Sequence, residues 1–170
     1  MKNYTFIDFD GVILDSEQRM LERKFELGFT NHKDKIQFNK FFEYTNQHPE
    51  EWNYIIKQAN QINDSIKIIK ELESLKKEIA ILTKIHTLYE MKVKVEEIRT
   101  RQKINCPIIF VPPDLKKHQI IIPNGQVLID DSAKNIAEWI SHGGKGYIFE
   151  PNISNNTLKK VKSLEFLLKE

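Results

Sequence analysis

The sequence contains a single cysteine, Cys106, so no disulfide bond can form within the chain. A lone cysteine fits a reducing compartment, and we expect the protein in the cytoplasm. No apolar run is long enough to cross a membrane. We expect no signal peptide either, because Asp8 and Asp10 interrupt the apolar stretch near the N-terminus.

The sequence also has little net charge. Its formal charge of +2 is too small to favour nucleic acid or an anionic membrane as a partner. One segment is locally basic, but Glu90, Glu96 and Glu97 interleave with its cations, as on a solvated helix face. Those cations are Lys92, Lys94, Arg99, Arg101 and Lys103. We therefore expect no membrane contact and no stable nucleic-acid binding, while the oligomeric state is unknown from the sequence.

The remaining composition is that of an ordinary globular protein. Apolar residues make up 40% and charged residues 29% of the 170 residues, which is enough for one domain with a small insertion. Short runs rich in isoleucine, valine and phenylalanine predict buried parallel strands. These runs are residues 4–7, 79–82, 107–111, 126–129 and 146–149.

Segments with helical spacing separate these runs. The predicted helices are residues 64–77, 86–104, 133–141 and 157–169. Strands that alternate with helices indicate an α/β fold with a parallel sheet.

One long segment, residues 16–62, breaks this alternation. It shows helical periodicity and no strand-like run, with Pro49 as a helix breaker. Its length is too great for a loop. We predict a small helical insertion at 16–62 and a core formed by 1–15 and 63–170.

The predicted insertion is rich in aromatic residues. They could simply form its core, or some could line a pocket and stack on a planar group of a ligand. Both interpretations stay open for Phe25, Phe29, Phe38, Phe41, Phe42, Tyr44, Trp52 and Tyr54.

Polar residues follow three of the predicted strands. Asp8 and Asp10 end the first, Thr83 ends the second, and the pair at 130–131 ends the fourth. In doubly wound sheets, ligands bind beyond the carboxyl ends of the strands, where the strand order reverses. If the first and fourth strands are neighbours, four carboxylates converge there. Such a cluster needs a hard cation, and oxygen ligands suggest Mg²⁺.

An EF-hand loop and a solvated strand end both account for the acidic pair less well than a Mg²⁺ site at the strand ends does. An EF-hand loop also begins Asp-x-Asp, but Gly11 comes two residues too early, and Arg19 occupies the position that requires glutamate. A solvated strand end would account for Asp8 and Asp10 alone. It does not account for Thr83 and a second acidic pair at matching strand ends.

These residues carry a resemblance. DFDGV at 8–12, LT at 82–83 and IDD at 129–131 are similar, in order, to motifs of the haloacid dehalogenase (HAD) superfamily of phosphotransferases. The motif lysine is Lys117 or Lys116 by position, with Lys117 favoured. The resemblance implies a HAD-like Rossmannoid three-layer sandwich, with a five-stranded parallel sheet and a small helical cap inserted after the first strand.

The resemblance also implies roles for the residues. Asp8 would be the nucleophile and Asp10 the general acid and base. Thr83 and the lysine would bind phosphoryl oxygens. Mg²⁺ would be held by Asp8, the backbone carbonyl of Asp10 and Asp130, with Asp131 holding metal-bound water. Gly11 would let backbone N–H groups approach the phosphate.

The branch of the superfamily is less distinct. The stretch DGVILDSE at 10–17 resembles the sugar-phosphate phosphatases, whereas VLIDDSAKNIAEWISHGGKGYIF at 127–149 resembles the cytosolic 5′(3′)-deoxyribonucleotidase family and its bacterial and phage relatives. The expected function is a Mg²⁺-dependent phosphomonoesterase acting on nucleoside monophosphates. A small sugar-phosphate phosphatase and a non-catalytic binder of phosphate ligands are the alternatives.

Overall fold

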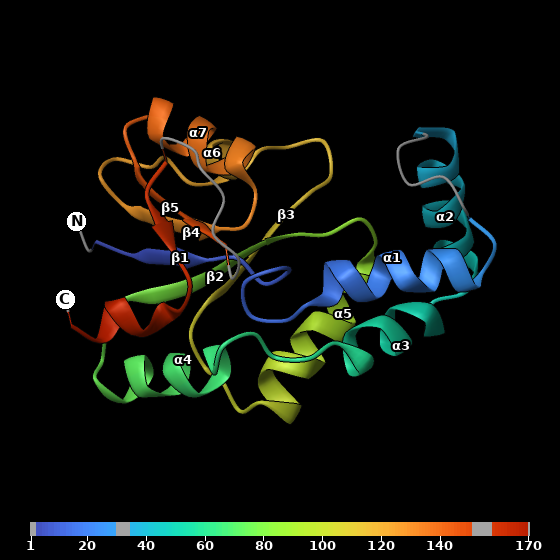
Figure 1. Cartoon of the computed structure of the whole chain (residues 1–170), viewed down its shortest axis with the longest axis horizontal. Helices are drawn as coiled ribbons and strands as arrows, with labels where there is room; N and C mark the ends of the chain where they lie inside the picture. Colours follow the sequence, from blue (N-terminus) through green and yellow to red (C-terminus); the bar gives the residue numbers. More distant parts are fainter. Residues whose placement is uncertain (1–2, 30–34, 151–157, 170) are drawn as a thin grey trace.

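The computed structural model describes residues 3–29, 35–150 and 158–169 (Figure 1). These residues form a six-stranded parallel sheet in the order β3-β2-β1-β4-β5-β6. The strands are β1 (Thr5–Ile7), β2 (Ile79–Lys84), β3 (Ile108–Val111), β4 (Val127–Asp130), β5 (Lys145–Phe149) and β6 (Lys160–Val161). The five predicted strands are therefore present, and the predicted strand number is too low by one. The two residues of β6 are too few to give a strand pattern in the sequence.

The helices between the strands agree with the predicted alternation, but a short helix at 117–120 was not predicted and two of the predicted helices differ. They are α1 (Ser16–Glu26), α2 (Lys35–Gln47), α3 (Glu50–Gln58), α4 (Ser65–Ser74), α5 (Leu88–Glu96), the π-helix η1 (Glu97–Arg101), α6 (Lys117–Ile120), α7 (Ala133–Ser141) and the 3₁₀-helix η2 (Leu164–Leu168).

The first difference is in the predicted helix 86–104, which changes at residue 97 from α-helix to π-helix. The second is in the predicted helix 157–169: among its described residues only the 3₁₀-helix η2 is helical, and the residues before it include strand β6. There the chain pairs with β5, and the Ser163 side chain then accepts a hydrogen bond from the Glu165 N–H at the start of η2. Residue 157 lies outside the described residues.

Both faces of the sheet are buried, as the unbroken apolar runs predict. Alternate residues point to opposite faces: Phe6 and Leu128 pack toward α7, whereas Ile7 and Ile129 pack toward α4, α5 and η2. Trp139 of α7 is fully buried on the first face, and its indole N–H donates to the Gln126 carbonyl at 3.0 Å. Figure 1 shows the resulting three layers, which confirm the predicted sandwich.

Helices α1, α2 and α3 follow β1 and lie together at one end of the molecule (Figure 1). An ion pair at 2.6 Å between Arg23 and Glu51 joins α1 to α3. The chain leaves the core and returns to it at adjacent points, because the Asp15 N–H donates to the Asn60 carbonyl at 2.9 Å and the Ile62 N–H to the Ile13 carbonyl at 3.0 Å.

Two features noted in the sequence, the shortness of its apolar runs and its single cysteine, can be described in the structure. None of the helices in the described residues has both the length and the apolar character needed to cross a bilayer. Cys106 is a buried free thiol, and burial raises its pKa to about 12. The thiol is therefore protonated and weakly nucleophilic at neutral pH.

Candidate functional site

The site lies where the strand order reverses. Strand β1 pairs with β2 on one side and with β4 on the other, and Ile7 is in register with Ile129. The Asp8 N–H donates to the Ile129 carbonyl at 2.9 Å. Asp8 therefore lies beside Asp130 at the carboxyl edge of the sheet, and Thr83 lies near the end of β2. The adjacency of the first and fourth strands, on which the prediction of a shared site depended, is present.

Three carboxylates meet at this edge. Oxygen atoms of Asp8, Asp130 and Asp131 lie within 4.8 Å of one another. Burial raises the pKa of Asp8 to about 7 and that of Asp131 to about 8, and repulsion between these acids adds to both shifts. Hard oxygen donors that resist ionisation without a counter-charge fit a divalent cation such as Mg²⁺. Asp8, Asp130 and Asp131 are the residues that could hold it.

Lys117 belongs to this cluster and Lys116 does not. The Lys117 ammonium lies 2.9 Å from Asp8 and 2.6 Å from Asp130. Burial alone would lower the pKa of Lys117, but Asp130 and Asp8 raise it above its usual value. Lys116 precedes α6 and points outward, where its ammonium pairs with Glu138 at 2.7 Å. The sequence could not separate two adjacent lysines, because the choice depends on where α6 begins.

The start of α7 fixes the orientation of Asp130. Asp130 is fully buried, and its carboxylate accepts hydrogen bonds from the Ser132 N–H at 2.8 Å and from the Asn135 amide at 3.0 and 3.1 Å. Ser132 is also the N-cap of α7, since its hydroxyl accepts from the Asn135 N–H. The same local turn that begins the helix therefore holds the acid in place.

The side chain of Asp10 is turned away from the three other acids. One of its oxygens accepts from the Ser16 hydroxyl at 2.6 Å. The other accepts from Lys94 at 2.5 Å and from the Thr83 hydroxyl at 3.3 Å. Three of the four predicted carboxylates thus converge, whereas the fourth, that of Asp10, pairs with the Lys94 ammonium instead.

Sequence reasoning missed Lys94 as part of the site. It predicted that this lysine lies on a solvated helix face, but the side chain is fully buried. The buried face of α5 and η1 carries Glu90, Val93, Lys94 and Glu97, at helical spacing but with alternating charge. A search for apolar periodicity cannot detect such a face. A search for acid–lysine pairs four residues apart would have found Glu90 and Lys94.

Gly11 is required by its close contact with Asp131. Its φ of +72° is in the region that favours glycine, and a Cβ atom there would lie 2.1 Å from the Asp131 carboxylate. Its own N–H donates to the Leu14 carbonyl at 2.8 Å. This N–H is therefore used within the turn, which differs from the expected approach to a phosphate.

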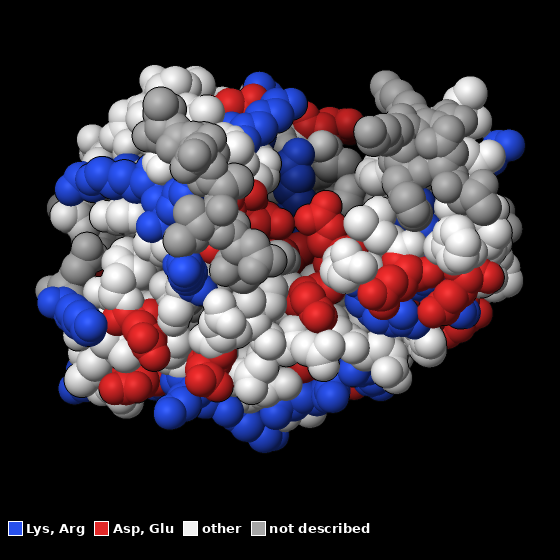
Figure 2. All heavy atoms as spheres, in the orientation of Figure 1, with Lys and Arg blue, Asp and Glu red and all other residues white. Residues whose placement is uncertain are grey.

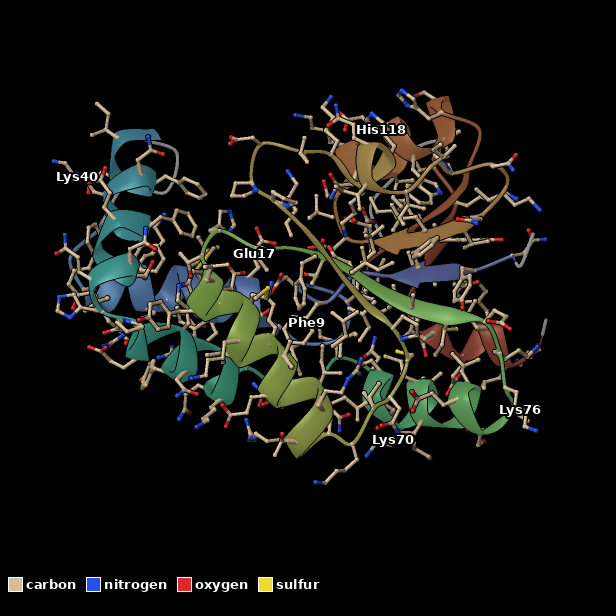
Figure 3. The ribbon with its side chains drawn as sticks, turned by 180° about the vertical axis from the view of Figure 1, so that it is seen from behind. Phe9, Glu17, Lys40, Lys70, Lys76 and His118 are labelled. Atoms are coloured by element: carbon tan, nitrogen blue, oxygen red, sulfur yellow. The ribbon has the colours of Figure 1, made fainter. Side chains whose placement is uncertain are left out.

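A cavity of about 250 Å³ opens above these residues. Its floor includes Asp8, Asp10 and Lys117, and Glu17 lies at the side. Figure 2 shows acidic side chains gathered at the hollow between the sheet and helices α1 to α3. In Figure 3, Glu17 lies near the centre of the molecule, whereas Lys40 and His118 lie on its outer parts. A larger, more open groove of about 520 Å³ lies beside Lys67 and Lys70, but the acidic cluster does not line it.

The wall opposite the acids is apolar and comes from α1, α2 and α3. It consists of Met20, Phe38, Trp52, Ile55 and Ile56. The aromatic residues of the predicted insertion lie in different surroundings, and stacking of any of them on a ligand stays a prediction. Phe38 and Trp52 line the cavity, whereas Phe41 is fully buried in the core. Tyr54 packs on the surface against Arg19 and Arg23.

Solved structures similar to this chain include hydrolases of the HAD superfamily. A haloacid dehalogenase-like hydrolase from Streptococcus pneumoniae is 16% identical, with a TM-score of 0.69 over 99% of this chain and 98% of that one. The HAD-hydrolase YfnB from Bacillus subtilis, bound to magnesium, is 12% identical, with a TM-score of 0.63 over 99% and 97%. CbbY from Rhodobacter sphaeroides, in complex with phosphate, is 11% identical, with a TM-score of 0.62 over 96% and 95%.

No protein-family model and no curated protein matches the chain. At such low identity the similarity shows the fold, and the chain has the HAD-like fold. The finer resemblance to the deoxyribonucleotidase family stays a prediction.

Proposed function

We propose that the protein is a Mg²⁺-dependent phosphomonoesterase that works through an aspartyl-phosphate on Asp8. The observation that carries this proposal is the arrangement of Asp8, Asp130, Asp131 and Lys117 at the strand-order reversal of a HAD-like fold. It combines a nucleophile, a set of ligands for a cation and a fixed ammonium group in one buried place.

The residues divide the reaction between them. A carboxylate oxygen of Asp8 attacks phosphorus, and the bond from phosphorus to the ester oxygen breaks. Asp10 gives its proton to the departing oxygen, and then takes a proton from the water that hydrolyses the aspartyl-phosphate. Lys117 stabilises the phosphoryl oxygens, whereas the buried Thr83 hydroxyl contacts Asp10. When bound, Mg²⁺ supplies positive charge between the nucleophile and the phosphate.

The substrate that we propose is a nucleoside monophosphate, with the deoxyribonucleotides included. Phe38 lines the cavity above Asp8 and is 36% exposed. A flat base can stack on such a ring while the phosphate reaches the acids. Residues 16–62 would then act as a cap that recognises the leaving group, and residues 1–15 and 63–170 as the core that performs the chemistry.

Mg²⁺ is expected to stabilise the folded protein. At a concentration a hundredfold above its Kd, the gain is about 2.7 kcal/mol, because only the native state brings the three acids together. The gain grows as the pH rises through about 7 and about 8, because Asp8 and Asp131 must lose their protons to bind the cation. Thermal unfolding with and without Mg²⁺ measures this effect. Asp130→Asn is expected to abolish it, and an equal shift in this variant would contradict the assigned ligands.

A phosphate-release assay tests the function itself. The panel contains deoxyribonucleoside and ribonucleoside monophosphates, sugar phosphates and an aryl phosphate, each with Mg²⁺ and with EDTA. We expect release only with Mg²⁺, and the highest kcat/KM for a nucleotide. A higher value for a sugar phosphate would overturn the nucleotide assignment. Binding of nucleotides by calorimetry without any release would overturn the catalytic one.

A further inference from the structure

The buried ammonium group of Lys94 contacts two of the predicted motif residues. Its Nζ lies 2.5 Å from an Asp10 oxygen and 3.2 Å from the Thr83 hydroxyl oxygen. It also donates to the Lys84 carbonyl at 2.9 Å. Burying an ammonium group is costly unless its partners compensate for the lost water. Lys94 therefore has a partner set that fixes its position, and these partners differ from those of Lys117, which pairs with Asp8 and Asp130.

A second carboxylate, that of Glu90, also contacts the Lys94 ammonium. Glu90 lies one turn earlier on α5, and its carboxylate lies 2.8 Å from the Lys94 ammonium. The other Glu90 oxygen accepts from the His86 N–H at 2.6 Å. Burial alone would raise the pKa of Glu90, but Lys94 and His86 lower it to about 2. Glu90 is thus a fixed negative charge that holds the ammonium against Asp10.

We propose that Lys94 is a positioning residue that holds the Asp10 side chain in the orientation needed for proton transfer. This inference rests on the proposed phosphomonoesterase activity. Lys94 and Thr83 both donate to one oxygen of Asp10. The other oxygen faces Ser16, whose hydroxyl can donate to a carboxylate or accept from a carboxylic acid. This second oxygen is therefore the one that exchanges protons with substrate and water.

The inference predicts a dependence on the leaving group. An aryl phosphate such as para-nitrophenyl phosphate releases a stable phenolate and needs little help from an acid. A nucleoside monophosphate releases an alkoxide unless a proton arrives, and general acid catalysis contributes about 10²-fold to 10⁴-fold in such a step. Lys94→Met is expected to lower kcat/KM about 10²-fold for the nucleotide. For the aryl phosphate, the expected loss of kcat/KM is below about tenfold, because kcat/KM covers only the steps up to departure of the leaving group and not the later hydrolysis in which Asp10 acts as the base.

Matched variants separate positioning from a loss of structure. Lys92→Met removes an exposed lysine from the same helix and should leave both rates unchanged. Because Lys94→Met leaves the Glu90 charge buried, a second variant combines it with Glu90→Gln and should show the same selective loss. In an Asp10→Asn background, Lys94→Met should add little to the loss for the nucleotide, because both changes act through one group.

The outcomes are distinct. Equal losses of kcat/KM for the two substrates would overturn the positioning role, and so would full additivity with Asp10→Asn. Wild-type protein that releases no phosphate from either substrate would overturn the proposed function, and the inference with it.

Discussion

Asp8→Asn is expected to lower kcat by a factor of about 10⁴ or more, with every phosphate ester that the protein hydrolyses. The amide that replaces the carboxylate is a poor nucleophile, and no other described carboxylate occupies its place beside Lys117 and Asp130. The measurement is the rate of phosphate release under saturating substrate and Mg²⁺. Unchanged activity would remove Asp8 from the mechanism.

The free energy of unfolding is the control for this variant, and the direction in which it changes can be predicted. Burial and neighbouring acids raise the pKa of Asp8 to about 7, so the native state opposes ionisation of this group. Between the ordinary pKa of 3.8 and about 7, the native state therefore binds more protons than the unfolded state, so stability falls as the pH rises through this range and levels off above it. In EDTA at about pH 8, Asp8→Asn should be at least as stable as the wild type in urea unfolding. Lost activity together with retained stability assigns the effect to chemistry.

Lys117→Met is expected to cost about 3–5 kcal/mol in the free energy of unfolding, because it leaves Asp8 and Asp130 buried without their cation. The loss should grow with pH, since the two acids can escape the penalty by taking up protons at low pH. The same change removes a donor to the phosphoryl oxygens, so kcat should fall about 10²-fold to 10³-fold. Urea unfolding in EDTA and the phosphate-release assay measure the two effects.

Lys116→Met is the matched control, because it removes the neighbouring lysine from the exposed surface. Its ion pair with Glu138 should contribute no more than about 1 kcal/mol, and kcat should not change. Equal effects of the two variants would contradict the assignment of Lys117 to the site.

The sheet and its carboxyl edge were predictable from the sequence, because buried parallel strands appear as continuous apolar runs. Strand β6 was not, since Lys160 and Val161 form a strand only by pairing with β5. The short spacing from Asp8 to Gly11 was visible too. The contact that makes Gly11 necessary involves Asp131, which is far away in the chain, so only the folded structure reveals it.

The same limit applies to the candidate site, where contacts between distant residues could not be predicted from the sequence. Acids at strand ends marked the place, but their individual orientations depend on partners from other elements. Asp10 turns toward Lys94 rather than toward the other acids because α5 places a buried ammonium group at the end of β2, where it also donates to the Lys84 carbonyl. In the sequence, Lys94 is one of several lysines that alternate with glutamates, and only burial distinguishes it from Lys92.

The adjacent exit and return of the chain, at Asp15 and Asn60, have a consequence for how such a protein can diversify. From the viewpoint of the core, everything between these two residues is one closed loop. The entropy of closing a loop rises slowly with its length. Changing the length of α1 to α3 therefore costs little closure entropy, but a replacement must still cover the apolar cluster that Trp52 and Ile55 share with Val93. Within that limit, the apolar wall of the cavity can change in evolution while the acids stay where they are.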